Sequence, residues 1–367
     1  MSNIPWWSPQ IGPHELGLVK EVLESGYINE GEVTARFERQ IAELVGAKHA
    51  VATTSGTTAI FLALAARGIG HGDEVIVPDV TFIATANAVT LTGATPVLVD
   101  VDPRTLNIEP SAFERAVTSR TKAVVPVHVT GRGADMKAVC AIAKKHGLVV
   151  VEDAAEALRS KHEGRWLGTW GDAGCFSFSP NKTITSGQGG MIVTDDDALA
   201  QRVRELKDQG RPVRGTGGDD LHPSLGFNFK LTNLQSAVAL GQLRYLEERL
   251  ARQRRIYELY AKGLAGVRGI EVIRFDIEGG ACPQWTDVLC DRRDALEEHL
   301  RARGASTRKF WFPLHTQAPY RLADDAFPTA TAATKRALWL PSAFTLSDDD
   351  VRKVVEHVRS FYEEKSR

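Results

Sequence analysis

The hydrophobic and polar positions of the first half of the chain alternate between helical and strand periods. Segments with apolar residues at helical spacing are 14–24, 33–45, 59–67, 83–92, 111–117 and 136–145. Short apolar runs lie at 50–52, 74–78, 96–100, 123–128 and 148–153. The last run stays apolar until its two carboxylates, which is typical of strands buried on both faces. The alternation predicts an α/β fold with a mostly parallel central sheet flanked by helices.

The pattern changes after residue 190. A charged helix is predicted over residues 197–207, and a glycine-rich loop follows over 210–223. The stretch 231–264 contains a long helix rich in Arg and Glu. Small residues at 237–241 would allow another segment to pack closely against this helix.

The C-terminal part of the chain indicates a second domain. From Ile270 onward, short strands alternate with helices at 292–303 and 348–364, which suggests a smaller α/β unit. We therefore predict a large domain over residues 1–245, including the N-terminal helical segment, and a small domain over 246–367. The boundary is predicted within the long helix, near residue 245.

The composition is that of an ordinary globular protein. The chain has 367 residues, of which 43% are hydrophobic and 25% are charged, and its net charge is -1. This charge balance gives no reason to expect binding to nucleic acid or to an anionic membrane. No apolar run approaches the ~18 residues of a membrane-spanning helix. The N-terminus also has neither the basic nor the apolar region of a secretory signal.

The four cysteines bear on location and on metal binding. Cys140, Cys175, Cys282 and Cys290 are scattered along the chain, without the close pairs of a metal site. We therefore expect reduced thiols, no bound metal and a cytoplasmic protein.

Lys182 lies in a predicted turn between two strands. Phe176 and Phe178 alternate on the first strand, and residues 191–193 form the second. A lysine held on such a stiff support can act as a nucleophile and form a Schiff base. The alternative is a solvated surface lysine, which this stretch alone does not exclude.

Residues 55–58, Ser-Gly-Thr-Thr, lie between a predicted strand and a helix. The first turn of a helix has free N–H groups and a positive dipole end, so it can bind a phosphate, and Gly56 would allow close approach. Ser177 is a further candidate for a phosphate contact, five residues before Lys182. The alternative for residues 55–58 is a helix N-cap without a ligand.

Two more residues suit an aromatic cofactor. Asp153 ends a buried strand, where a carboxylate needs a partner such as a protonated pyridine nitrogen. Phe82 follows the end of another strand and could cover a flat ring. The alternatives are a helix-capping role for Asp153 and a core position for Phe82.

The order of these signals is that of fold-type I pyridoxal-phosphate enzymes: phosphate loop, aromatic, carboxylate, serine, lysine. The chain resembles one branch closely, the sugar aminotransferases of the DegT/DnrJ/EryC1/StrS family, which include the perosamine synthases. The resemblance covers nearly the whole chain. It rests on residues 55–59, 72–78, 81–88, 93–97, 152–157, 176–178, 181–185, 189–191 and 226–235.

The resemblance implies a pyridoxal 5'-phosphate site in a fold-type I aminotransferase. Lys182 is similar to the family's Schiff-base lysine, and Asp153 to the partner of the pyridine nitrogen. Phe82 resembles the residue that stacks on the ring, and Glu156 a residue near the cofactor's phenolic oxygen.

The resemblance also implies a homodimer with active sites at the subunit interface. Gly56, Thr57 and Ser177 resemble the family's phosphate site, which Asn228 of the partner subunit would complete. Asn228 lies shortly before the helix with small residues, which suits packing between subunits.

The implied reaction moves an amino group from a donor, usually glutamate in this family, to a keto-sugar. Lys182 would carry a proton between the donor and the cofactor as general base and acid, with ping-pong kinetics. Some relatives have His in place of this lysine and catalyse a dehydration. The presence of Lys182 favours transamination.

Three departures from the family pattern affect the identity of the sugar. Residues 186–190 read Ser-Gly-Gln-Gly-Gly where many relatives read Thr-Gly-Glu-Gly-Gly, and residues 128–131 read His-Val-Thr-Gly where they read His-Leu-Tyr-Gly. Residues 308–315 resemble a family Arg-Pro-x-Phe-x-Pro-x-His segment, with Lys309 in place of Pro. Trp311 and His315 are candidate substrate contacts, although Trp311 would equally suit the core.

We therefore expect a nucleotide-linked 4-keto-6-deoxyhexose as acceptor, in cell-surface polysaccharide or aminosugar biosynthesis. An acceptor of the free 8-oxo octulosonate type is an alternative. A second alternative is a non-catalytic sensor that binds the cofactor or a sugar, although the intact Lys182 and Asp153 argue against it.

Overall fold

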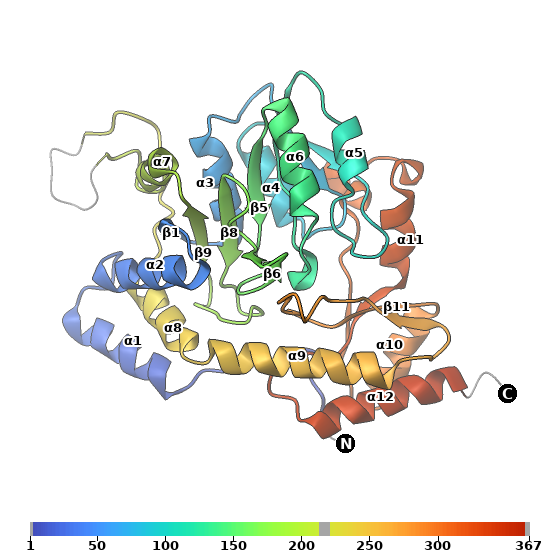
Figure 1. Cartoon of the computed structure of the whole chain (residues 1–367). Helices are drawn as coiled ribbons and strands as arrows, with labels where there is room; N and C mark the ends of the chain where they lie inside the picture. The colour runs from blue at the N-terminus through green and yellow to red at the C-terminus, as the bar shows by residue number, and fades with distance from the viewer. Residues whose placement is uncertain (1–2, 213–220, 364–367) are drawn as a thin grey trace.

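A seven-stranded sheet forms the centre of the computed structural model, which describes residues 3–212 and 221–363 (Figure 1). The strand order is β1-β9-β8-β5-β4-β2-β3. The bounds are β1 His49–Thr53, β2 Glu74–Pro78, β3 Thr95–Val99, β4 Thr121–Val124, β5 Val149–Asp153, β8 Ala173–Ser177 and β9 Gly190–Thr194. β9 runs antiparallel to both β1 and β8, and the other neighbours are parallel. The predicted α/β fold with a mostly parallel sheet is confirmed.

Helices cover both faces of this sheet (Figure 1). Their bounds are α1 Pro13–Ser25, α2 Glu32–Val45, α3 Gly56–Ala66, α4 Ala84–Leu91, α5 Pro110–Arg115, α6 Met136–His146, α7 Asp197–Lys207 and α8 Asn233–Leu243. Val75 and Val77 of β2 belong to the core that contains α3 and α4, whereas Ile76 belongs to the core that contains α2 and α6. Successive side chains of a strand point to opposite faces, so burial on both faces requires uninterrupted apolar runs.

A second, four-stranded antiparallel sheet lies in the C-terminal part, with the order β10-β11-β13-β12. Its strands are β10 Ile270–Val272, β11 Asp287–Cys290, β12 Arg308–Lys309 and β13 Ala337–Trp339. The helices here are α9 Leu246–Gly263, α10 Arg293–Ala302, α11 Pro328–Arg336 and α12 Asp348–Glu363. α12 packs along α9 below the large sheet (Figure 1).

The remaining elements are short. A two-stranded hairpin contains β6 Lys161–His162 and β7 Arg165–Trp166. The 3-10 helices are η1 Val129–Gly131, η2 Leu314–Thr316, η3 Ala318–Tyr320 and η4 Asp324–Ala326. The middle of the glycine-rich loop predicted over 210–223 lies outside the described residues.

The long helix predicted within residues 231–264 is two helices. α8 ends at Leu243 and α9 begins at Leu246, so the chain changes direction beside the boundary predicted near residue 245. That boundary stays a prediction. The first residues, however, contact the C-terminal part: Ile4 N–H donates to Gly304 O at 2.8 Å, and Ser342 N–H donates to Trp6 O at 2.9 Å. The rings of Trp6 and Trp7 are partly buried against the aromatic core of the C-terminal part, which holds the N-terminal segment there.

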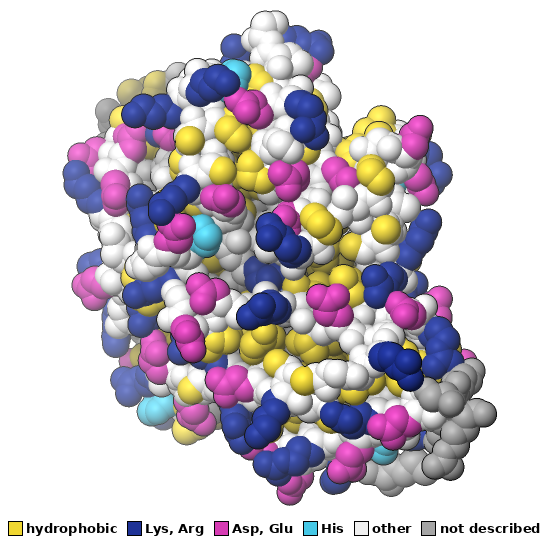
Figure 2. Space-filling model, turned by 45° about the vertical axis from the view of Figure 1, so that its right-hand side comes forward, with side chains coloured by type: hydrophobic (Ala, Val, Ile, Leu, Met, Phe, Trp, Pro, Cys, Tyr) yellow, Lys and Arg dark blue, Asp and Glu magenta, His cyan; other side chains and the backbone are white. Residues whose placement is uncertain are grey.

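Two findings concern the surface. Basic and acidic side chains are interspersed on the face shown in Figure 2, in keeping with the net charge of -1. Within residues 3–212 and 221–363, none of the helices combines the length and the apolar character that crossing a bilayer requires.

Candidate active site

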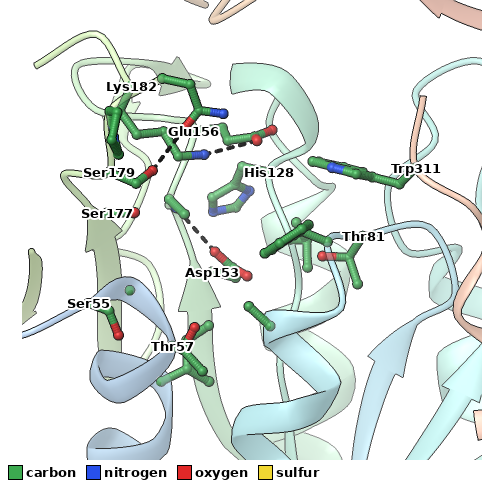
Figure 3. A pocket seen from close by; sticks show the side chains of 18 of the residues that line it. Ser55, Thr57, Thr81, His128, Asp153, Glu156, Ser177, Ser179, Lys182 and Trp311 are labelled. Atoms are coloured by element: carbon green, nitrogen blue, oxygen red, sulfur yellow. Dashed lines mark hydrogen bonds and ion pairs between the residues drawn. The ribbon is translucent and has the colours of Figure 1, made fainter. Parts of the chain in front are cut away.

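A cavity of about 360 Å³ opens where several parallel strands of the large sheet end. Open α/β sheets bind ligands at such strand ends. Figure 3 shows Lys182 and Glu156 at one end, Ser55 and Thr57 at the other, and Asp153 between them. The C-terminal part closes one side. The residues that line the cavity are Ser55, Gly56, Thr57, Ile60, Thr81, Phe82, Ala84, Val127, His128, Asp153, Ala155, Glu156, Ser177, Ser179, Pro180, Asn181, Lys182, Gln188, Trp285, Arg308 and Trp311.

The first turn of α3 forms one end of this cavity. Ser55 is the N-cap: its Oγ accepts from Thr58 N–H at 3.2 Å, and Thr58 Oγ1 accepts from Ser55 N–H at 3.0 Å. Helix geometry leaves the N–H groups of Gly56 and Thr57 without acceptors inside the helix. A Cβ on Gly56 would lie 2.9 Å from Ser177 Cβ, so glycine allows α3 to approach the end of β8. An N-cap role for Ser55 and a phosphate site at the same turn are therefore compatible, because the cap leaves the N–H groups of Gly56 and Thr57 for a ligand.

Asp153 is held at the end of β5 with its carboxylate at the cavity. Thr85 Oγ1 donates to Asp153 Oδ2 at 2.7 Å, and Ala155 N–H donates to Oδ1 at 3.1 Å. Its side chain is nearly buried, since the residue is only 7% exposed. A further donor, such as a protonated ring nitrogen, would complete the bonding of this carboxylate.

Glu152, the preceding residue, points away from Asp153, as strand alternation requires. Its carboxylate accepts from the N–H groups of Gly168, Trp170 and Gly171 at 2.6–2.8 Å. Its Oε2 also lies 2.9 Å from His128 Nε2, while Ala134 N–H donates to His128 Nδ1 at 3.3 Å. These bonds fit the tautomer with the proton on Nε2, and they fix the ring that lines the cavity.

The Lys182 amine points to a carboxylate that is distant in sequence. Its Nζ lies 3.0 Å from Glu156 Oε1, and its side chain is 12% exposed. Thr130 N–H donates to the other oxygen, Glu156 Oε2, at 2.9 Å. Burial raises the pKa of Glu156, and the Lys182 ammonium acts in the opposite direction. Lys182 is therefore a cavity residue and not a solvated turn lysine.

Thr130 is a site residue that sequence reasoning missed. It has a left-handed backbone with φ 52°, and its Oγ1 donates to Asp287 Oδ2 at 2.8 Å. Asp287 in turn pairs with the buried Arg132 at 2.5 Å. The hydrogen bond from Thr130 to Asp287 of the C-terminal part holds Thr130 in the conformation in which its N–H points to Glu156. The sequence marked Thr130 only as a departure from a family motif.

Other predicted residues divide between the cavity and the surface. Phe82 lines the cavity and is 52% exposed, so its ring offers a face to a flat ligand. Trp311 lines the cavity as well. Its ring packs edge-on against the ring of Trp339, with 5.2 Å between the two ring centroids. Asn228 is exposed and is not among the residues that line this chain's cavity.

His315 lies elsewhere than expected for a substrate contact. Its side chain is fully buried, its Nδ1 lies 2.6 Å from Asp79 Oδ2, and its backbone N–H donates to Asp79 Oδ1 at 2.8 Å. Its ring stacks on Phe327, and it does not line the cavity. Burial raises the pKa of Asp79, and the bonds to His315 act in the opposite direction. The geometry supports a structural link between the C-terminal part and β2.

Sequence reasoning also missed part of the cavity wall. Thr81 and His128 follow the ends of β2 and β4, so the strand-end rule could have found them. Trp285 and Arg308 come from the C-terminal part, and no local pattern connects them to the large sheet.

Replacing His315 tests whether it is structural. In His315→Ala, the buried Asp79 carboxylate would lose its side-chain partner, so we expect the free energy of unfolding to fall by about 3 kcal/mol. Urea denaturation followed by circular dichroism measures the change. Lys309→Ala is the control, because that partly exposed lysine pairs with Asp294 and Glu297 near the surface and its replacement should have little effect. An unchanged stability with weakened ligand binding would instead support a substrate contact for His315.

Taken together, the cavity residues fit one phosphorylated aromatic aldehyde. The open N–H groups of α3 suit the phosphate, and the exposed face of Phe82 suits the ring. The incompletely bonded carboxylate of Asp153 suits a protonated ring nitrogen, and the amine of Lys182 suits the aldehyde. Pyridoxal 5'-phosphate carries all four of these groups.

Comparison with known proteins agrees with this reading. Residues 9–359 match the model of the DegT/DnrJ/EryC1/StrS aminotransferase family. A GDP-perosamine synthase of Caulobacter vibrioides is 40% identical over 97% of this chain and 98% of its own length. A crystal structure of DesI with its TDP-sugar product has a TM-score of 0.89 at 33% identity, covering 99% of this chain and 94% of the other.

A third comparison bears on the cofactor. The PLP form of the putative sugar aminotransferase Spr1654 from Streptococcus pneumoniae has a TM-score of 0.93 at 26% identity, covering 99% of each chain. The expected family and cofactor are thereby confirmed. The chain belongs to the DegT/DnrJ/EryC1/StrS family, and it is a pyridoxal-phosphate-dependent sugar aminotransferase.

Proposed function

We propose that this enzyme transfers the amino group of glutamate to a nucleotide-linked 4-keto-6-deoxyhexose, for aminosugar and cell-surface polysaccharide biosynthesis. Transamination is supported by one observation: the Lys182 amine, the Asp153 carboxylate and the first turn of α3 lie in the same cavity. The nucleotide is supported by the GDP-perosamine synthase and by the TDP-sugar product named for DesI. Both relatives match this chain over nearly its whole length.

Lys182 is the proposed catalytic residue. Bound pyridoxal phosphate supplies an electron sink for the carbon that loses a proton. Lys182 Nζ would hold the cofactor and, once released, would take up that proton and deliver it to the cofactor carbon on the other side of the transferred nitrogen. Glu156 Oε1, at 3.0 Å, keeps the amine directed into the cavity. A lysine at this position supports transamination over the dehydration that histidine-bearing relatives perform.

Five other residues are proposed to hold the cofactor. Asp153 would accept a hydrogen bond from the ring nitrogen and keep it protonated. Phe82 would cover one face of the ring, and Gly56, Thr57 and Ser177 would bind the phosphate. In each case the support is that the residue lines the same cavity as Lys182.

A free acidic keto-sugar is the second candidate acceptor. It is favoured by Gln188, which lines the cavity where many relatives that act on nucleotide-linked hexoses have Glu. An uncharged amide there would not repel a carboxylate of the sugar. A non-catalytic sensor is disfavoured, because Lys182 and Asp153 are both present and both face the cavity.

Replacing Lys182 tests the proposed role. Wild-type protein should be yellow with bound cofactor, and Lys182→Ala should lose this absorbance and the transaminase activity, because no other amine takes the place of Nζ. Absorption spectra of the purified proteins measure the first effect. Lys145→Ala, an exposed lysine paired with Glu114, should remain yellow and active. Wild-type protein that stays colourless with added pyridoxal phosphate would contradict the proposal.

We propose further that two copies of the chain share their active sites in a cytoplasmic homodimer. Asn228 is exposed and lies outside its own chain's cavity, so it is free to reach the phosphate site of a partner. Leu221 and Leu225, on the same segment, are 71% and 91% exposed, and a partner subunit would cover these apolar side chains. The four cysteines form no disulfide, which supports a reducing compartment.

Mixing one impaired variant with one inactive variant tests the shared site. Asn228→Ala should weaken phosphate binding, and Lys182→Ala should abolish catalysis. If sites are shared, a mixed dimer of the two variants has one site in which both residues are intact, so refolding the variants together should restore activity. Separate refolding of each variant provides the control. Activity that stays absent in mixtures shown to contain mixed dimers would contradict the shared site.

A further inference from the structure

Of the two basic side chains that line the cavity, Lys182 and Arg308, Arg308 is the one without a charged partner in the described parts of the chain. The other charged residues there are Asp153, Glu156 and Lys182. Lys182 pairs with Glu156, and Asp153 accepts two hydrogen bonds. For Arg308, no carboxylate within the described parts of the chain lies at ion-pair distance, and its side chain makes no hydrogen bond to those parts. Its five N–H donors therefore remain available to a ligand.

Aromatic rings support the Arg308 side chain. β12 pairs with β13 so that Arg308 lies opposite Trp339, which places the two side chains on one face of the small sheet. The guanidinium carbon lies 5.5 Å from the ring centroid of Trp339 and 4.9 Å from that of Trp6. Trp6 is itself bonded to the C-terminal part through Ser342 N–H. Cation–π contacts of this kind orient a guanidinium and leave its donors unused.

Lys309, the next residue of the same strand, has an ordinary structural environment for a cation. Lys309 points to the opposite face, where its Nζ lies 3.1 Å from Asp294 Oδ1 and 3.4 Å from Glu297 Oε2. Two adjacent cations thus have different surroundings. The partly buried Lys309 is neutralised by α10, whereas the exposed Arg308 lines the cavity and lies against two aromatic rings without a counter-charge. This contrast argues that Arg308 is placed for a ligand.

We propose that Arg308 is a specificity-determining residue that binds an oxyanion of a substrate, either a carboxylate of the amino donor or the anionic group of the sugar acceptor. The first turn of α3 would bind the cofactor's phosphate, so the guanidinium of Arg308 is available to bind a second anion. A guanidinium binds carboxylates and phosphates through two parallel N–H···O bonds, which selects for shape as well as charge. This inference rests on the proposed function, because that function supplies both kinds of anion.

The two half-reactions separate the two sources of the anion. Cofactor-loaded Arg308→Gln is mixed with glutamate alone, and the aminated form is then mixed with keto-sugars, while absorbance is followed. Loss of a charge-assisted hydrogen bond should raise the half-saturating concentration in one half-reaction about tenfold to a hundredfold, with a smaller change in the limiting rate. A donor effect identifies a carboxylate of glutamate, and an acceptor effect identifies the sugar's anion.

Two further variants separate shape from charge and from folding. Arg308→Lys keeps the charge but loses the planar fork, so its effect should lie between wild type and Arg308→Gln. Lys309→Gln, on the opposite face of the same strand, should leave both half-reactions unchanged. Retained cofactor absorbance in Arg308→Gln would show that the fold is intact.

A binding measurement makes the test independent of turnover. The loaded enzyme is titrated with 2-oxoglutarate and, separately, with GDP, while tryptophan fluorescence is recorded, because Trp6 and Trp339 lie against Arg308. Arg308→Gln should weaken one of these affinities about tenfold or more. Unchanged half-reactions and affinities in a folded, loaded variant would overturn the proposal. Failure of wild type to aminate any keto-sugar would overturn the proposed function instead, and the titrations would still test Arg308.

Discussion

The contact between Lys182 Nζ and Glu156 Oε1 is the interaction on which the rest of the site depends. Both side chains are almost buried, and burying either charge alone would cost several kcal/mol. The pair therefore requires accurate placement of both partners. Glu156 is placed by Thr130 N–H, and Thr130 is placed by Asp287 from the second sheet. The amine is thus oriented by groups from both parts of the chain.

The backbone around Lys182 is also held from several sides. Trp7 Nε1–H donates to Pro180 O at 3.2 Å, so the N-terminal segment is bonded to the lysine turn. Thr183 Oγ1 lies within hydrogen-bond distance of side chains on α9 and on the segment before β11, Gln253 and Gln284. A catalytic amine must be held close to its productive position, because small displacements reduce the rate strongly. The closing of one side of the cavity by the C-terminal part fits this need, since Trp285 and Arg308 line the wall.

Much of the large sheet and several residues of the cavity wall could be predicted from the sequence, because their signals are local. A strand that stays apolar until Asp153, and a Ser-Gly-Thr-Thr turn before a helix, report their surroundings within a few residues. The Lys182–Glu156 contact has no such signal, because the partners are 26 residues apart and meet only in the fold. His315 illustrates the opposite problem. A histidine in a family motif suggested chemistry, but its bond to Asp79, 236 residues away, buries it. The surroundings of Arg308 became clear only in the fold, since the two rings that lie against it belong to Trp6 and Trp339, which are distant from it in sequence.

Transamination by this enzyme is tested most directly by tracing the nitrogen atom from the amino donor to the sugar. The enzyme is incubated with glutamate that carries isotope-labelled nitrogen and with a panel of nucleotide-linked and free keto-sugars, and the products are analysed by mass spectrometry. The product should be an amino sugar that contains the label, formed together with an equal amount of 2-oxoglutarate, because a ping-pong transamination transfers the group without exchange with free ammonia. An unlabelled or dehydrated sugar, or label released as ammonia, would contradict this transamination.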